Sequence, residues 1–243
     1  MGNYLLTYKR FGDSAVLIEW PKSISIKILN NIRQFAIEIE KCNDEAILDV
    51  SYVYSSLVII YDVKKYSFQK IVLFLKSVYK STFISIITTK NVWQIPVCYD
   101  VDFGIDLGVL ASEKKLLTED IISLHTSSCY TVYGIGFLPG FLYLGGLKEK
   151  LHLPRRSTPR LEVPKGSVAI GGNQTGIYPQ NSPGGWHIIG RTPVSMFDVK
   201  KDIPCNILPG DEIKFEAISR EEYDSLLKTQ EIGAYELKNI SND

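Results

Sequence analysis

The sequence predicts an α+β domain at residues 1–90 followed by a mainly β domain at residues 91–218, with a helical tail at residues 219–243. Helical and strand periodicities alternate in the first part. After Lys90 the composition changes, because ten of the eleven prolines and sixteen of the eighteen glycines lie there. Proline is excluded from central strand positions and glycine permits positive φ, so short strands joined by tight turns are expected in this second part.

In the N-terminal part, four apolar residues recur at spacings of four, three and four, which places them on one face of a helix. A helix packed on a sheet is the simplest way to bury such faces. The predicted elements are strands at 4–11 and 15–20 around a Gly12-Asp13-Ser14 turn, a helix carrying Ile28, Ile32, Phe35 and Ile39, strands at 47–51 and 57–61, a helix at 67–80 and a closing strand at 83–88.

In the second part, a short helix is expected to begin at Thr118 as N-cap, with Glu119 and Asp120 in its first turn, and to end near His125. A closed or nearly closed barrel would hide the edges of the short strands that follow. The tail at 220–243 is expected to form one polar helix. The expected strands are residues 131–136, 167–171, 186–192 and 213–217.

Composition excludes several classes of protein. Lysine plus arginine and aspartate plus glutamate both number 27, so the basic excess of a nucleic-acid binder is absent. No apolar run approaches the ~18 residues of a membrane span, and the start lacks the pattern of a signal peptide. A cytoplasmic location is therefore expected. The four scattered cysteines and the three histidines, which lack acidic partners at ligand spacing, predict neither a metal site nor a disulfide scaffold.

The densest tract is glycine-rich and reads YGIGFLPGFLYLGGL at residues 133–147. Pro139 stands where a dinucleotide fingerprint needs its third glycine, and the chain contains no GxxxxGK[ST] phosphate loop. Two interpretations remain open. The tract is either a turn packed on an apolar wall or a loop whose Pro139, Gly140 and Phe141 line a cleft.

A second tract, LPRRSTPRLEVPKGS, places three arginines within six residues between stiffening prolines. The guanidinium fork suits carboxylate or phosphate, so a rigid arginine loop can hold an anion. The alternative is that these side chains lie on a solvated face or pair with Glu162 and Asp198. The arginines are Arg155, Arg156 and Arg160.

The third tract, GGNQTGIYPQNSPGGWHIIGRTP, sets the polar side chains Gln174, Tyr178 and Arg191 among glycines. Trp186 and the nearby Phe197 are expected to form an apolar wall. Such a pocket suits a small amide-containing acid. His125 is either a structural histidine at a helix C-terminus or a proton carrier. No G-x-S-x-G elbow is present to anchor a serine hydrolase.

These tracts, together with Leu124-His125-Thr126, closely resemble the signature sequences of the allophanate hydrolase subunit 1 family over about residues 95–209. The resemblance implies an N-terminal α+β domain and a cyclophilin-like β-barrel. In one loop this chain departs from the family pattern, since Asp100 and Val101 replace two glycines. We therefore leave Asp102 out of the predicted site.

The family includes the B component of bacterial 5-oxoprolinase, which implies a chain that is inactive alone. With 5-oxoprolinase subunits A and C, C being the direct barrel partner, it would open 5-oxo-L-proline to L-glutamate at the expense of ATP, whose place on this chain the sequence does not indicate. Polar donors would surround the anionic intermediate. The implied catalytic residues are His125, Arg156 and Gln174, and the implied substrate-binding residues are Pro139, Gly140, Phe141, Arg155, Tyr178, Trp186 and Arg191.

The family also contains an inhibitor of a sporulation kinase, so inhibition of a sensor histidine kinase is the alternative function. The same barrel tracts occur in both, and the sequence does not separate them. A carboxyl-transfer role like that of the related domain in urea carboxylase is not expected, because this chain carries no biotin-carrier or carboxylase segment.

Overall fold

The computed structural model describes residues 4–81 and 90–241. The chain divides into two compact units, Met1–Thr89 and Lys90–Asp243. Each unit has its own apolar core and is described by itself below. The strand predicted at residues 83–88 lies outside the described residues.

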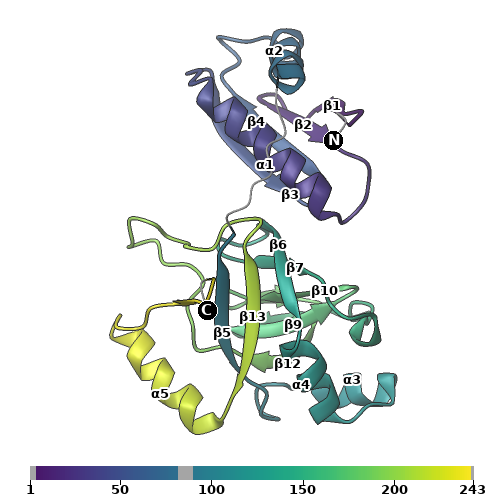
Figure 1. Ribbon diagram of the computed structural model, residues 1–243, viewed down its shortest axis with the longest axis vertical. Helices are drawn as coiled ribbons and strands as arrows, with labels where there is room; N and C mark the ends of the chain where they lie inside the picture. Colours follow the sequence, from purple (N-terminus) through teal and green to yellow (C-terminus); the bar gives the residue numbers. More distant parts are fainter. Residues whose placement is uncertain (1–3, 82–89, 242–243) are drawn as a thin grey trace. The chain divides into compact units, whose positions relative to one another are not determined.

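The first unit packs two helices with an antiparallel sheet of order β1-β2-β4-β3 (Figure 1). The elements follow one another in the predicted order, and all four apolar residues predicted to share a helix face are buried. The elements are β1 (Thr7–Arg10), β2 (Ala15–Glu19), α1 (Ile26–Lys41), β3 (Ile47–Val53), β4 (Ser56–Tyr61) and α2 (Phe68–Ser81).

A buried polar group fixes the packing of the two helices of this unit. The Oδ1 atom of Asn31 accepts hydrogen bonds from Nε1 of Trp20 at 2.6 Å and from the hydroxyl of Tyr79 at 2.9 Å. Since both donors are removed from water, the amide oxygen satisfies groups that would otherwise be costly to bury.

In the second unit, seven strands among the described residues close into a barrel. The ring runs β6-β13-β5-β12-β9-β10-β7 and returns to β6; β13 and β5 are parallel and the other pairs antiparallel. Closure leaves none of these strands at a free edge, as expected. The strands are β5 (Val92–Cys98), β6 (Cys129–Ile135), β7 (Leu142–Gly145), β9 (Ser167–Gly171), β10 (Gln174–Ile177), β12 (His187–Arg191) and β13 (Glu212–Ile218).

Short elements surround the barrel, with α5 on one side and α3 and α4 on another (Figure 1). Helix α3 was not predicted. Its sequence LGVLASEK buries only Leu107 and Leu110, which is too few to set up a recognisable period. The elements are α3 (Leu107–Lys114), α4 (Thr118–Thr126), the 3-10 turn η1 (Glu149–Leu151), β8 (Arg160–Val163), β11 (Ser182–Gly184), α5 (Arg220–Glu231) and β14 (Lys238–Asn239).

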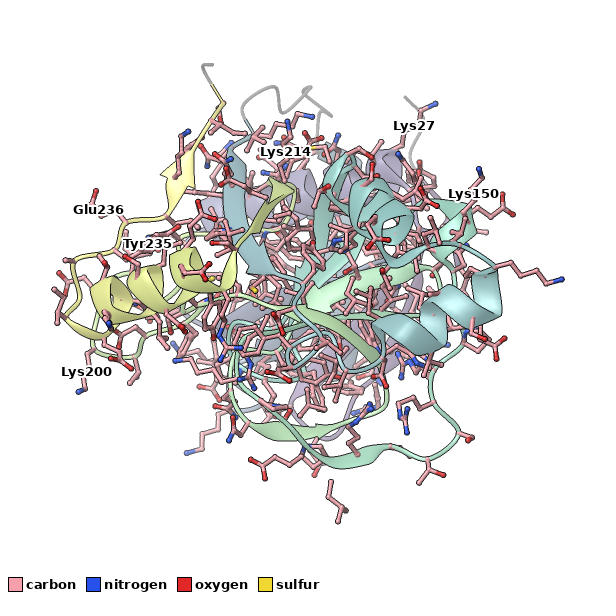
Figure 2. All side chains as sticks on the ribbon, turned by 90° about the horizontal axis from the view of Figure 1, so that it is seen from below. Lys27, Lys150, Lys200, Lys214, Tyr235 and Glu236 are labelled. Carbon is pink, nitrogen blue, oxygen red and sulfur yellow. The ribbon has the colours of Figure 1, made fainter. Side chains whose placement is uncertain are left out.

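Two predictions for this unit were wrong in detail. Thr118 is the first helical residue of α4 and not its N-cap, and the carboxylate of Asp120 instead reaches back to the backbone N–H of Leu117. The tail is not one helix, because α5 ends at Glu231 and the chain returns as β14 to pair with β5. Figure 2 shows Tyr235 and Glu236, in the segment that makes this return, beside α5.

Across the described residues, no helix has the length and apolar character needed to cross a membrane.

Candidate functional site

A pocket of about 190 Å³ on the second unit collects several of the residues predicted to form a site. Three parts of the chain converge on it. These are the β6–β7 hairpin, the irregular segment that precedes β8, and the residues that connect β10 with β12. Its lining consists of Phe137, Phe141, Tyr143, Arg155, Arg156, Pro159, Tyr178, Gly184, Gly185 and Trp186.

The apolar wall of the pocket is a cluster of aromatic rings packed edge to face. The ring of Phe141 lies 5.2 Å from that of Tyr178 and 5.6 Å from that of Trp186, at interplanar angles of 90° and 84°. Such contacts add to the stabilisation from buried area, so the wall is a fixed surface. Phe137 also lines the pocket, with its ring 5.8 Å from that of Phe141. Its φ of 65° is uncommon for a bulky residue, and it is 65% exposed.

Tyr178 gives this wall one polar atom. Its side chain is 2% exposed, and burial raises the pKa of its hydroxyl, while a hydrogen bond with the backbone of Trp186 partly opposes the rise. The phenol therefore keeps its proton near neutral pH and can act as a hydrogen-bond donor or acceptor.

Two of the three clustered arginines reach the pocket. The guanidinium carbon of Arg155 lies 5.8 Å from the ring centroid of Trp186, within the range of a cation–π contact. Arg156 is anchored at its backbone, where its N–H donates to the carbonyl of Gly185 at 2.8 Å. The Nε atom of Arg156 is buried and has no hydrogen-bond partner among the described residues.

The third arginine is committed to a partner that the sequence did not suggest. Arg160 forms a bidentate pair with Asp106, with Nη1 to Oδ2 at 2.9 Å and Nη2 to Oδ1 at 2.6 Å. Glu162 instead accepts a hydrogen bond from Asn181, and Asp198 accepts one from the backbone of Lys200. Among the described residues, the arginine loop pairs with Asp106 and not with Glu162 or Asp198, so the alternative in which it pairs with those two acids is not supported.

His125 lies away from the pocket, in the core of the barrel. It is fully buried, and its ring nitrogens lie 2.7 Å from the hydroxyl of Tyr99 and 3.0 Å from Oγ1 of Thr175. The hydroxyl of Thr175 donates its hydrogen bond to the carbonyl of Ala169, so its oxygen must accept from Nε2 of His125. Nε2 of His125 therefore carries a proton, and in the neutral imidazole Nδ1 accepts from the hydroxyl of Tyr99.

Burial lowers the pKa of His125 to about 3, which agrees with this neutral form. Burial also raises the pKa of Tyr99, so that hydroxyl keeps the proton it donates. Every hydrogen-bonding group of the imidazole is satisfied inside the barrel. The geometry therefore supports a structural role for His125 and gives no support to the predicted proton carrier.

Four other predicted site residues also lie outside the pocket lining. Gln174 is half-buried on β10, and strand alternation puts it on the same face as Gly176, which packs on Trp186. Arg191 lies over the ring of Phe103, 5.2 Å from its centroid. Pro139 is exposed at the hairpin tip, whereas Gly140 is buried.

Gly140 supports the pocket without lining it. Its φ is 83°, and a β-carbon there would lie 2.6 Å from Cβ of Phe197. Only glycine allows this backbone conformation and this close approach together. The turn at Gly140 thus packs against Met196 and Phe197, and of the three residues expected to line a cleft only Phe141 lines the pocket.

The chain is similar to proteins of a known family. Residues 6–207 match the family described as "Carboxyltransferase domain, subdomain C and D", and this range contains the whole pocket lining. The chain belongs to this carboxyltransferase-domain family. Its relatives also fit the allophanate hydrolase subunit 1 family, which confirms the resemblance seen in the sequence.

Curated members of the family include proteins named as the B component of 5-oxoprolinase. The one from Bacillus subtilis is 35% identical over 225 residues, which cover 88% of this chain and 94% of that protein. The one from Haemophilus influenzae is 39% identical over 203 residues, which cover 84% of this chain and 93% of that protein.

Several solved structures are similar to this chain. The crystal structure of TTHA0988 is 32% identical in sequence to this chain and superposes with a TM-score of 0.75. The match covers 84% of this chain and 40% of TTHA0988. PH0987 from Pyrococcus horikoshii is 42% identical, with a TM-score of 0.54 and 89% and 100% of the two chains covered. The urea amidolyase of K. lactis is only 18% identical, but its TM-score of 0.84 shows that it shares the fold. This match covers 98% of this chain and 16% of the urea amidolyase chain.

The resemblance to this family implies ATP, and the pocket does not suit a nucleotide. At about 190 Å³ it is smaller than the roughly 300–1,000 Å³ of sites that enclose drug-sized ligands. The part of the chain that the structure describes also contains no group of three acidic, cysteine or histidine side chains placed to hold a metal ion. The size of the pocket, its aromatic wall and its two arginines instead suit a small anion with an apolar face.

Proposed function

We propose that this chain is the B component of a 5-oxoprolinase complex. Together with subunits A and C, the complex would open the lactam of 5-oxo-L-proline to L-glutamate with hydrolysis of ATP. The observation that carries the proposal is the match, along 94% and 93% of their lengths, to two proteins named as this component of 5-oxoprolinase. The chain would be inactive alone.

The chemistry of the pocket supports this choice of substrate. 5-Oxoproline has about nine non-hydrogen atoms, well below the drug-sized ligands of larger pockets. Its flat ring suits the aromatic wall formed by Phe141 and Trp186, and its carboxylate suits the guanidinium of Arg156. The Tyr178 hydroxyl can form a hydrogen bond with the carbonyl oxygen of the lactam.

The positive charge at the pocket also favours an anionic ligand. Arg155 and Arg156 line the pocket, and Asp106 is the one carboxylate found against either of them within the described residues. That carboxylate already forms a bidentate pair with Arg160. A partly buried cation without a matching anion is unfavourable, so a carboxylate ligand would complete the site.

The lactam is a stable amide, and ATP would supply the activation needed to open it, at a site that we do not assign to this chain. The contribution of this chain would be to bind the substrate, to fix the orientation of its ring against the aromatic wall and to keep water away from that face. Positioning of this kind can supply a large part of a rate enhancement.

Reconstitution tests the proposal. We expect the purified chain alone to release no glutamate from 5-oxoproline, and the mixture with co-expressed A and C subunits to release it in an ATP-dependent manner. Omission of ATP, or of any one polypeptide, is the control. A complete mixture that forms a stable complex and releases no glutamate would exclude this function.

Inhibition of a sensor histidine kinase stays an untested prediction from the sequence resemblance. The same purified chain can be added to such a kinase, and unchanged autophosphorylation at saturating protein would count against it.

A further inference from the structure

Asp106 is fixed to the barrel by two reciprocal hydrogen bonds. Its backbone N–H donates to the carbonyl of Ile188 at 2.9 Å, and the N–H of Ile188 donates to its Oδ2 at 2.7 Å. The side chain is only 3% exposed. Gly104 packs closely on the next residue of β12, because a β-carbon there would lie 2.5 Å from the carbonyl oxygen of Ile189. The carboxylate is therefore held at a fixed position relative to β12.

The two arginines that contact this carboxylate are bound unequally. Arg160 takes one short bond to each oxygen, at 2.6 and 2.9 Å, in the fork geometry that is strongest for this pair. Arg156 has a single contact, from Nη1 to Oδ1 at 3.4 Å, near the limit for a hydrogen bond. Because Arg160 and the backbone N–H of Ile188 already form the short hydrogen bonds to the carboxylate of Asp106, Arg156 keeps most of its donors free.

The free donors of Arg156 include Nε, which is buried and without a partner among the described residues. A buried donor that lacks an acceptor is costly, and the cost is removed when an acceptor arrives. Arg156 also lines the pocket, and its backbone is tied to Gly185. A carboxylate on its free edge would satisfy the donors that Asp106 leaves unused.

We propose that Asp106 is a positioning residue. Its carboxylate holds Arg160 in a fixed ion pair and orients the guanidinium of Arg156, which binds the carboxylate of the substrate. This inference rests on the proposed function, since it takes the carboxylate of 5-oxoproline as the anion. Asp106 itself does not touch the substrate and acts through Arg156.

Asp106→Asn in the reconstituted complex is the first test. The amide offers donors where Arg160, Arg156 or Ile188 needs an acceptor, so either orientation of the amide breaks part of the network. We expect KM for 5-oxoproline to rise roughly tenfold while kcat changes less than about twofold. The matched control is Asp102→Asn in the same loop. The side chain of Asp102 is 78% exposed, and its Oδ2 lies 3.8 Å from Nη1 of Arg220. The KM of the Asp102→Asn complex for 5-oxoproline should equal the wild-type value.

A double-mutant cycle separates positioning from a general structural effect. If Asp106 acts through Arg156, Asp106→Asn should raise KM about tenfold in the wild-type background and less than about twofold in an Arg156→Ala background. An equal effect in both backgrounds would show that Asp106 supports the fold generally, and would overturn the proposal.

A measurement on the wild-type chain covers the case in which the Asp106 variant does not fold. In ¹H–¹⁵N spectra of the guanidinium groups, 5-oxoproline should shift the Nε–H signal of Arg156 and leave that of Arg160 in place. Arg156→Lys and Arg160→Lys assign the two signals. A response of Arg160 alone, or of both equally, overturns the division of roles.

The two proposals fail in different ways. If neither arginine signal responds and the complete mixture releases no glutamate, the proposed function falls and this inference falls with it. If the mixture is active and KM is unchanged by Asp106→Asn in a folded chain, only the role of Asp106 is wrong.

Discussion

The indole of Trp186 lies directly on the backbone of Gly171. A β-carbon at Gly171 would come within 2.5–2.6 Å of three indole atoms, which is closer than side chains pack. A β-carbon added at Gly176 on the neighbouring strand would lie 3.0 Å from Cζ3 of the same ring. Two buried glycines, in β9 and β10, therefore support the indole that forms one wall of the pocket.

Gly171→Ala should displace the indole into the pocket. Gly171 lies in β9 without a positive φ, so the backbone accepts alanine and the clash acts on the ring. We expect a loss of roughly 1–3 kcal/mol in the free energy of unfolding, as for overpacked cores, and weaker binding of 5-oxoproline. Urea unfolding and calorimetric titration measure the two effects.

The control for this change is Gly108→Ala in α3, where nothing lies within 4 Å of the added carbon. It should leave binding unchanged and raise the free energy of unfolding by about 0.5–1 kcal/mol, because alanine is favoured in helices. Tight binding by a folded Gly171→Ala chain would show that the position of Trp186 does not shape the ligand site.

Arg156→Ala should weaken use of 5-oxoproline by the complex and leave the isolated chain folded. The change removes the guanidinium fork proposed to hold the carboxylate, so kcat/KM should fall by about tenfold to a hundredfold. Arg156→Lys keeps the charge without the fork and should recover only part of the loss. Steady-state kinetics of the reconstituted complex and a thermal melt of the isolated chain are the measurements.

Arg220→Ala is the matched arginine control, since Arg220 contacts Phe103 and Asp102 and lies outside the pocket. Its kinetics should equal those of the wild-type protein. Wild-type activity in the Arg156→Ala complex would contradict the assignment of the anion site.

The stability of the second unit should fall as the pH drops below about 6.5. The unfolded chain protonates its histidines near that value, whereas burial lowers the pKa of His125 to about 3 in the folded state. The contribution of neutral His125 is therefore complete above pH 6.5 and is lost progressively toward pH 3. The free energy of unfolding should fall by about 1.4 kcal/mol per pH unit from this group in that window.

Histidine NMR spectra test the same point directly. The imidazole signals of His125, assigned by their loss in His125→Gln, should stay in the neutral form with the proton on Nε2 from pH 8 to pH 5. A midpoint between pH 6 and 7 for these signals would show that the imidazole is accessible to solvent, and would revive a role for it in proton transfer.

Lys115→Gly should stabilise the chain. Lys115 follows α3 with φ 53° and ψ 43°, the left-handed conformation that glycine favours at this position of a helix end. We expect a gain of roughly 0.5–1 kcal/mol in the free energy of unfolding, measured by urea titration. Lys114→Gly, one residue earlier and inside the helix, should instead cost about 1 kcal/mol. A loss at both positions would mean that the backbone at Lys115 is not left-handed.

Local patterns in the sequence predicted those parts of the fold that depend on neighbouring residues. The spacing of Ile28, Ile32, Phe35 and Ile39 identified α1, since a 3.6-residue repeat puts them on one face. Helix α3 was missed because its two buried leucines do not establish a repeat. The tail was misjudged because β14 is stabilised by pairing with β5, which lies about 145 residues away in the chain.

The candidate site divides in the same way. Five of the residues chosen from the sequence, Phe141, Arg155, Arg156, Tyr178 and Trp186, meet in one pocket. His125 and Arg191 were chosen for residue type, yet the first faces the barrel core and the second packs on Phe103. Asp106 was missed because it lies 50 and 54 residues from its two arginines, and no local spacing records such a pairing.

The sequence by itself determined the family, the change of composition near Lys90 and the presence of arginines beside aromatic and glycine-rich turns, because these are properties of contiguous residues. Only the tertiary structure decided which arginine is free. Arg156 and Arg160 lie four residues apart and have the same chemistry, but the buried carboxylate of Asp106 binds one with two short bonds and the other with a single long one. Closure of the barrel sets that difference, because it brings the segment before α3 against β12 and beside the arginine loop.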